Sequence, residues 1–348
     1  MATSTNATDM TPLPGDDAPL FHGGDLGATR RLFPGATEPF IDLSTGINPH
    51  PYPVPRIPSA LFASLPDPGA AETLAQVAAR AYGAPSRAHV VAAPGSQILL
   101  PLVAALAPPG RAVIITPGYS EHSRAASLAG HTVTAIGDID QCGDATLVVV
   151  GNPNNPDGRI FPQSDLVALA KTLRRRNGVL VADEAFMDVG RSDQSLAGDV
   201  ACGNIVVLRS FGKFFGLAGL RLGFALASPP LAARLRAHLG PWAVSAPALT
   251  IGTRGLADAV WIERTRRRLD KAAQRLDGIL SGAALTIVGG TSLFRLVRTP
   301  PAGALFAHLG RAGIFVRAFP EHPDWLRFSL PANEDAWRRL KKALVAFW

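Results

Sequence analysis

Cysteine, tyrosine and long apolar runs are scarce in this chain of 348 residues. The two cysteines, Cys142 and Cys202, match no metal-ligand spacing and no disulfide framework, so we expect a cytoplasmic protein without a bound metal. No apolar run reaches the length of a membrane span, which predicts no membrane attachment. The first 20 residues lack a basic stretch followed by an apolar core, so they predict a flexible leader rather than a secretory signal.

Charged side chains are also few, at 18% of the residues, whereas hydrophobic residues make up 47%. This composition is typical of a compact folded protein rather than a disordered one. The net charge of +7 raises the question of nucleic-acid binding, but the basic clusters, within residues 174–176 and 264–268, are short. We therefore expect solvated helix faces or attraction for small anionic substrates, and no nucleic-acid partner.

Short apolar, β-branched runs alternate with helix-like stretches from about residue 70 onward. Helical periodicity is clear in Ser96–Leu106 and Gln163–Arg176. Continuous apolar strands separated by helices predict an α/β fold with a mostly parallel seven-stranded sheet and helices on both faces. The expected strands are His89–Ala93, Ala112–Thr116, His131–Ile136, Ala145–Val150, Gly178–Ala182, Asn204–Arg209 and Leu222–Ala227.

The pattern changes after about residue 240, which divides the expected large domain (56–240) from a smaller α+β domain (241–348). Residues 21–55 are rich in Gly, Pro and Asn and predict an ordered but irregular arm. In the smaller domain we expect a long helical region followed by four strands, at Thr250–Leu280, Ala284–Val288, Ser292–Val297, Ile314–Arg317 and Leu326–Leu330.

A lysine stands just beyond the sixth expected strand, in Ser210-Phe-Gly-Lys213-Phe-Phe-Gly-Leu-Ala-Gly-Leu-Arg221. Its small and apolar neighbours would desolvate Lys213, lower its pKa and make it a nucleophile toward an aldehyde. Arg221 lies among glycines, where a guanidinium suits a bidentate contact with a phosphate. Taken alone, the segment fits a surface lysine in a glycine-rich loop equally well.

Three other strand ends carry polar residues at the edge where ligands bind in parallel sheets. Ser96, in Ala93-Pro-Gly95-Ser96-Gln97, can cap the next helix, whose free N–H groups would bind an anion. Asn155 lies in a run of turn formers and can donate to a phenolate oxygen. Asp183 ends a buried strand and needs a partner, for which a protonated pyridine nitrogen is suited. An ordinary helix cap and a plain turn are alternatives for Ser96 and Asn155.

These elements resemble, over nearly the whole chain, the fold-type I pyridoxal-5′-phosphate (PLP) enzymes of the class I/II aminotransferase group. The resemblance implies a PLP-dependent transferase-like fold in which Lys213 holds the cofactor as a Schiff base. It also implies that Lys213, Asp183 and Tyr119 are catalytic, with Tyr119 stacked on the cofactor ring. The implied cofactor contacts are Gly95, Ser96, Gln97, Tyr119, Asn155, Asp183, Ser210, Lys213 and Arg221.

Two positions depart from the pattern of that group. Phe186 stands where a tyrosine usually follows the Asp-x-Ala step, so one hydrogen bond to the cofactor's O3′ would be absent. Leu65 stands where a partner subunit often contributes a tyrosine to the cofactor phosphate. Related enzymes are commonly dimers, so a homodimer is expected, although Leu65 weakens any argument from a shared active site.

The amino-terminal arm resembles the threonine-phosphate decarboxylases of cobalamin biosynthesis in two segments, Phe21-His22-Gly23-Gly24-Asp25 and Ile41-Asp-Leu-Ser-Thr-Gly46-Ile-Asn48-Pro49. The resemblance implies that this arm covers the active site and joins the smaller domain. That subfamily often has Asn where Gly46 stands. A phosphate plus a carboxylate calls for at least two fixed cations, which Arg317 and Arg327 supply in either order. The implied contacts of a small phosphorylated amino-acid substrate are His22, Gly23, Gly46, Asn155, Arg317 and Arg327.

The resemblance implies decarboxylation of O-phospho-L-threonine to (R)-1-aminopropan-2-yl phosphate and CO2, with Lys213 returning a proton to Cα. The first alternative is an aminotransferase that acts on a substrate such as histidinol phosphate. Such an enzyme would use the same lysine to move a proton from Cα to C4′ of the cofactor, so the lysine motif alone does not distinguish the two reactions. A non-catalytic protein with the same fold is the second alternative. The joint presence of Lys213, Asp183, Asn155 and Arg221 argues against that second alternative.

Overall fold

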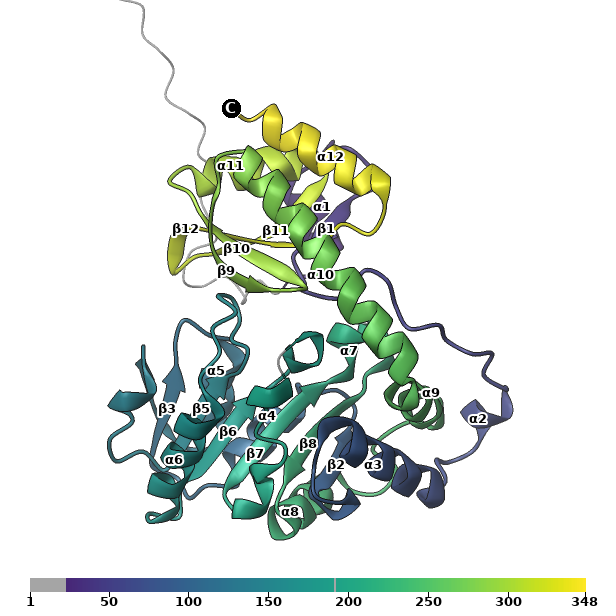
Figure 1. The fold of residues 1–348 in the computed structure, drawn as a ribbon, viewed down its shortest axis with the longest axis vertical. Helices are drawn as coiled ribbons and strands as arrows, with labels where there is room; N and C mark the ends of the chain where they lie inside the picture. Colours follow the sequence, from purple (N-terminus) through teal and green to yellow (C-terminus); the bar gives the residue numbers. More distant parts are fainter. Residues whose placement is uncertain (1–22, 191) are drawn as a thin grey trace, which may run out of the picture. The chain divides into compact units, whose positions relative to one another are not determined.

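The computed structural model describes residues 23–190 and 192–348, which divide into two compact units (Figure 1). The larger unit comprises Ile47–Lys271 and Gly290–Leu293. The smaller unit comprises the described residues up to Gly46 together with Ala272–Gly289 and Phe294–Trp348. The expected leader, residues 1–20, lies outside the described residues, as does His22.

A seven-stranded sheet forms the centre of the larger unit, in the order β2-β8-β7-β6-β5-β3-β4 (Figure 1). Its strands are parallel except that β8 runs antiparallel to both of its neighbours, so the predicted sheet is confirmed. Every predicted strand is present to within two residues. The strands are β2 Val90–Ala93, β3 Arg111–Ile115, β4 Thr132–Ile136, β5 Leu147–Gly151, β6 Val179–Asp183, β7 Ile205–Ser210 and β8 Gly223–Ala227.

Both faces of this sheet are buried, which explains why its strands are apolar without alternation. One face packs against helices α4, α5 and α8 in a single apolar cluster that includes Val91, Ile114, Val149 and Leu208. Residues of the other face, such as Val148 and Leu180, are also fully buried. The helices of this unit are α2 Ala60–Ala63, α3 Pro68–Tyr82, α4 Leu99–Ala104, α5 Glu121–Leu128, α6 Gln163–Arg174, α7 Phe211–Phe214, α8 Pro229–Leu239 and α9 Ala246–Ala257, with short 3-10 helices η1 Arg87–His89, η2 Ile139–Gln141, η3 Met187–Val189, η4 Ser192–Gln194, η5 Asp199–Cys202 and η6 Ala218–Leu220.

The long helical region expected at Thr250–Leu280 is two helices, α9 and α10 (Ala259–Gly282), which meet at Asp258. The Asp258 carboxylate accepts a hydrogen bond from Trp261 N at 2.9 Å, as an N-cap residue does at the start of a helix. Helix α9 packs on α3, so it belongs to the larger unit, although the sequence placed the domain limit near residue 240.

The smaller unit is an α+β unit built on a five-stranded sheet in the order β1-β11-β12-β10-β9. Strand β1 comes from the arm and pairs in parallel with β11, so the arm is part of this sheet rather than wholly irregular. The strands are β1 Ile41–Leu43, β9 Thr286–Thr291, β10 Phe294–Arg298, β11 Ile314–Phe319 and β12 His322–Ser329, and the helices are α1 Leu26–Leu32, α11 Ala302–Arg311, α12 Glu334–Val345 and the second half of α10.

Within the described residues, no helix is both long enough and apolar enough to cross a membrane. The same residues contain no cluster of His, Cys, Asp and Glu suited to a metal ion. Both cysteines are free thiols, and burial raises the pKa of Cys142 to about 11.

Candidate active site

The carboxyl ends of six strands and the start of β8 lie at one edge of the larger sheet. Strands β2, β5, β6 and β7 run in the same direction, so their last residues lie at the same edge. In the register of the sheet, Asp183 of β6 lies opposite Gly151 of β5, and Gly223 of β8 lies opposite both Ala93 and Ser210. This edge is where a parallel sheet binds ligands.

A group of small residues and one arginine lies at the β2–β8–β7 part of this edge. Gly95 has a φ of 90° and so close a contact with Arg221 that a Cβ atom there would lie 2.6 Å from the guanidinium. A Cβ on Gly223 would lie 2.3 Å from Ser96 N. The backbones of Gly95 and Gly223 therefore allow Ser96, Ser210 and Arg221 to gather closely, as phosphate binding requires.

Ser96 does not cap helix α4, so that prediction was wrong. The helix begins three residues later, at Leu99, and its N-cap position is Ile98, which makes no side-chain capping bond. Residues 97 and 98 form a turn instead, in which Leu99 N donates to Ser96 O at 3.1 Å. Any anion binding by Ser96 therefore rests on its own hydroxyl and amide and not on the end of α4.

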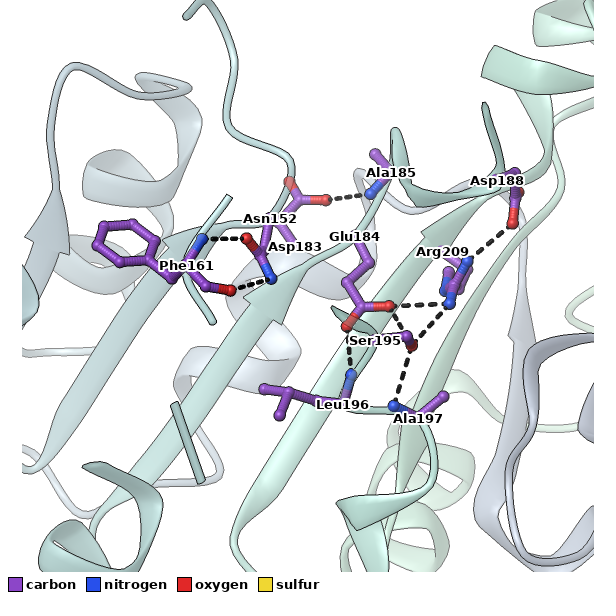
Figure 2. Close-up of polar contacts among 10 residues, drawn as sticks. All are labelled: Asn152, Phe161, Asp183, Glu184, Ala185, Asp188, Ser195, Leu196, Ala197 and Arg209. Atoms are coloured by element: carbon purple, nitrogen blue, oxygen red, sulfur yellow. Dashed lines mark hydrogen bonds and ion pairs between the residues drawn. The ribbon is translucent and has the colours of Figure 1, made fainter. Parts of the chain in front are cut away.

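Asp183 is held by its neighbours on both carboxylate oxygens. Its Oδ2 lies 2.8 Å from Nε2 of His122, and its Oδ1 accepts a hydrogen bond from Ala185 N (Figure 2). His122 is buried on helix α5, with 4% of its side chain exposed. The sequence did not predict this role of His122, whose only signal was its position three residues after Tyr119.

Tyr119 lies beside this pair, with its ring edge-on to His122 at a centroid distance of 5.5 Å. Its hydroxyl donates to Gln97 Oε1 at 3.0 Å, and Gln97 Nε2 donates to Glu121 Oε2 at 2.9 Å. Two of the predicted residues, Tyr119 and Gln97, are therefore in direct contact. Half-buried Asn155 follows β5 in the loop that contains Asn154, whose Nδ2 donates to Pro117 O at 2.7 Å.

Lys213 lies on the short helix α7, which directly follows β7. Its backbone carbonyl accepts a hydrogen bond from Asn48 N at 3.0 Å, and Asn48 Nδ2 donates to Phe214 O at 2.8 Å. The Lys213 ammonium lies 5.5 Å from the centroid of the Phe186 ring. Asn48, which is 2% exposed, is a second residue whose role the sequence did not predict.

Four of the expected substrate-binding residues lie in the smaller unit, namely Gly23, Gly46, Arg317 and Arg327, whereas Asn155 lies in the larger unit. Arg317 of β11 and Arg327 of β12 are opposite one another in the antiparallel register, so two cations share one face of the sheet. Arg327 is buried, donates to Ser44 O and lies 5.0 Å from the Phe294 ring centroid. Burial and the neighbouring Arg317 lower the pKa of Arg327, while Asp42 opposes that shift. An anion bound at this face would offset the repulsion between the two guanidinium groups.

Gly23 is connected to Arg327 through Ser44, whereas Gly46 contacts Ser329, two residues after Arg327 on the same strand. Gly24 N donates to Ser44 Oγ at 3.0 Å, and a Cβ on Gly23 would lie 2.6 Å from Ser44 O. Gly46, at a φ of 63°, donates its N–H to Ser329 Oγ at 2.8 Å. The smaller unit thus brings together all of its predicted residues except His22, which lies outside the described residues.

Taken together, the larger unit provides hydroxyls and a guanidinium for a phosphate, a carboxylate for a ring nitrogen, an aromatic ring and a lysine. This set of donors fits the phosphorylated pyridine aldehyde expected from the sequence.

The sequence of residues 60–344 matches the family described as aminotransferase class I and II. The chain belongs to this family. Its match covers most of the larger unit and reaches into α12 of the smaller one.

Individual relatives and solved structures agree with this membership. A threonine-phosphate decarboxylase of Pseudomonas aeruginosa is 40% identical over 334 residues, which cover 94% of this chain and 98% of the relative. A histidinol-phosphate aminotransferase of Paramagnetospirillum magneticum is 31% identical, over 81% of this chain and 85% of the relative. The crystal structure of a histidinol-phosphate aminotransferase from Sinorhizobium meliloti, in complex with pyridoxal-5′-phosphate, has a TM-score of 0.78 at 24% identity and covers 94% of this chain and 95% of its own. That structure shows the shared fold.

Proposed function

We propose that this chain is a PLP-dependent lyase that decarboxylates O-phospho-L-threonine, for cobalamin biosynthesis. The observation that carries the proposal is the 40% identity to a threonine-phosphate decarboxylase over nearly the full length of both chains. The reaction takes up one proton and yields CO2 and (R)-1-aminopropan-2-yl phosphate. Within the larger unit the contacts of Asp183 and Lys213 support it, and within the smaller unit the opposition of the two arginines does so.

In this proposal the larger unit holds the cofactor, which when bound supplies an electron sink for the bond broken at Cα. Arg221, with Ser96 and Ser210, binds its phosphate. Asp183 keeps the ring nitrogen protonated, and His122 orients the Asp183 carboxylate. Tyr119 lies against the ring, Asn155 donates to O3′, and the phosphate side is completed by Gly95 and Gln97.

Lys213 has two tasks, of which the first is to bind the cofactor covalently through its ε-amine. The second is to return a proton to Cα after CO2 has left. The contacts of Asn48 with the backbone of α7 support both tasks, because they fix the helix that carries Lys213.

The substrate's two anionic groups are bound by Arg317 and Arg327, one for the carboxylate and one for the phosphate. His22, Gly23 and Gly46 contribute further contacts to the substrate, as does Asn155. Support for the pair comes from their direct opposition in the sheet and from the burial of Arg327.

Transamination of a substrate such as histidinol phosphate is the second candidate, favoured by the relative from Paramagnetospirillum magneticum. That relative is less similar to this chain than the decarboxylase is, since it is 31% identical over 81% of the chain, against 40% over 94%.

We also propose that the protein acts as a homodimer in the cytoplasm. The exposure of two large apolar side chains in the larger unit, Phe62 at 71% and Leu65 at 67%, supports an interface there. Light scattering on the purified protein tests this part, and a monomeric mass would contradict it.

The reaction is tested by incubating PLP-loaded protein with O-phospho-L-threonine and measuring CO2 release. A parallel assay with histidinol phosphate and 2-oxoglutarate measures glutamate formation. CO2 release without any requirement for a keto acid is the expected result. Glutamate formation without CO2 release would instead assign the chain to the aminotransferases.

A further inference from the structure

Two charged residues are buried directly behind the expected cofactor site. Glu184 follows Asp183 at the end of β6, and Arg209 precedes Ser210 at the end of β7. Since adjacent residues of a strand point to opposite faces, each belongs to the face away from its neighbour in the site. The Glu184 and Arg209 side chains are 0% and 3% exposed.

The two side chains form an ion pair within a buried hydrogen-bonded cluster, in which Arg209 Nε and Asp188 Oδ2 have no hydrogen-bond partner among the described residues (Figure 2). Arg209 Nη2 lies 2.8 Å from Glu184 Oε2, and Ser195 Oγ donates to the same carboxylate oxygen at 2.7 Å. Leu196 N donates to Glu184 Oε1 at 2.7 Å. The second arm of the guanidinium, Nη1, donates to Asp188 Oδ1 at 2.8 Å. One planar guanidinium therefore fixes Glu184, Ser195 and Asp188 together.

Further contacts connect this cluster to the backbone of the site and to two helices. Glu184 N donates to Leu208 O at 2.9 Å, which continues the pairing of β6 with β7 past Asp183. The Arg209 guanidinium lies 4.8 Å from the ring centroid of Tyr82 on α3. Arg266 of α10 donates through Nε to the backbone oxygen of Asp188. Asp183 and Ser210 are thus adjacent along the chain to a buried cluster on the opposite face of the sheet, which contacts α3 and α10.

The charges of the cluster make each member depend on the others. Burial raises the pKa of Glu184 and of Asp188, and Arg209 opposes both shifts. Breaking a buried ion pair by removing one partner leaves an uncompensated charge, whereas replacing both partners with apolar groups is often neutral for stability. Stability alone therefore does not require an ion pair at this place.

We propose that Glu184 and Arg209 are positioning residues for the cofactor site, which hold Asp183 and Ser210 at the spacing between the ring nitrogen and the phosphate. This inference rests on PLP being the cofactor of the proposed function, but not on which reaction the enzyme catalyses. A small displacement of either strand end would change the distance between Asp183 and Ser210, and with it the contacts to the ring nitrogen and to the phosphate. Displacements of this kind weaken binding and lower activity at functional sites.

The test uses cofactor-free protein and PLP alone, without any substrate. Glu184→Gln keeps the size of the side chain but removes its charge. We expect the dissociation constant for PLP to rise by about tenfold or more and the apparent pKa in a visible absorbance titration of the bound cofactor to change. Native affinity together with a native titration curve would overturn the proposal.

A matched control distinguishes positioning from a general loss of stability. Asn204 is also buried, at the opposite end of the same strand β7, and its Nδ2 donates to Ala170 O at 2.8 Å and to Gly178 O at 3.0 Å. Asn204→Ala should lower stability but leave the PLP affinity and titration unchanged. Equal weakening of PLP binding in Asn204→Ala and Glu184→Gln would overturn the proposal.

The double variant Glu184→Gln/Arg209→Met covers the case in which the single variant does not fold. It removes both charges of the pair, so it should fold while still binding PLP about tenfold or more weakly. Native PLP affinity in this variant would show that the pair is purely structural. None of these measurements contains O-phospho-L-threonine, so a failure of the decarboxylase proposal would appear only in the CO2 assay.

Discussion

Two buried arginines, one in each unit, differ in the charges around them. Arg209 lies 2.8 Å from the carboxylates of both Glu184 and Asp188, which outweigh the effect of burial and raise its pKa. Arg327 lies opposite Arg317 in the register of its sheet, and burial together with that second cation lowers its pKa.

The contrast indicates two uses of a buried cation. The counter-charges of Arg209 come from the protein, so its effect is to fix the strand ends that surround it. The arrangement around Arg327 favours an additional negative charge, which an anionic substrate would bring. Arg209 is thus paired within the protein, whereas a bound anion, such as the proposed substrate, would stabilise the arginine pair of the smaller unit.

The largest expected effect is on stability, in Arg209→Met. The substitution leaves Glu184 and Asp188 buried without their cation, so the free energy of unfolding should fall by about 3–5 kcal/mol. Urea unfolding of the cofactor-free protein, followed by circular dichroism, measures this loss. If the free energy of unfolding fell no more than in an ordinary surface substitution, Arg209 would not stabilise the fold, and the proposed difference between Arg209 and Arg327 would be wrong.

The next effect is on substrate binding, in Arg327→Met. Removal of one cation of the pair should raise KM for O-phospho-L-threonine about 10²-fold, because a fixed cation facing a desolvated anion contributes several kcal/mol. The free energy of unfolding should stay the same or increase, since the substitution relieves the repulsion from Arg317.

Arg295→Met provides the control for Arg327, because Arg295 lies on the neighbouring strand β10 but already pairs with Asp277 at 2.5 Å. Its KM should be native. A native KM in Arg327→Met, or a large loss of its stability, would mean that Arg327 is balanced within the protein as Arg209 is.

A smaller effect is expected from Phe186→Tyr in the larger unit. A hydroxyl added beside Lys213 can donate to the cofactor's phenolate oxygen, which favours the deprotonated form. The apparent pKa of the bound cofactor, measured by visible absorbance against pH, should therefore fall by about one unit. Phe186→Leu adds no donor and serves as the control, and a tyrosine variant without a downward shift would contradict the argument.

Local features of the sequence were sufficient to predict the sheet of the larger unit and most of the residues at its edge. The apolar runs of these strands end at Ala182, directly before Asp183, and at Leu208, two residues before Ser210. Such a strand end can be predicted without knowing what packs on it. His122 could not be predicted, because its contact with Asp183 depends on where helix α5 lies on the sheet. The pairing of Glu184 with Arg209 was missed for the same reason, since a charged residue beside a strand end is usually exposed.

The direct opposition of Arg317 and Arg327 also needed the structure, because the register of β11 and β12 includes a shift between Ala318 and Phe319. Such a shift has no reliable signal in the sequence. The two arginines were predicted as a pair from the family resemblance and from the two anionic groups of the expected substrate, and the register is what places them on one face.

The smallest effect is expected at an exposed ion pair of the larger unit. Comparing this pair with the buried pairs of Arg209 shows how much burial adds to the stability that an ion pair contributes. Arg87 Nη1 lies 2.5 Å from Glu72 Oε2, which is shorter than the 2.8 Å ion pairs of Arg209. However, 55% of the Arg87 side chain and 64% of the Glu72 side chain are exposed. Solvent screens such a pair, so Glu72→Gln should change the free energy of unfolding by less than about 1 kcal/mol, and less still at high salt. Urea unfolding at low and high salt beside Arg209→Met measures the difference. A loss as large as that of Arg209→Met would mean that distance, rather than desolvation, determines how strongly a charge pair holds this fold.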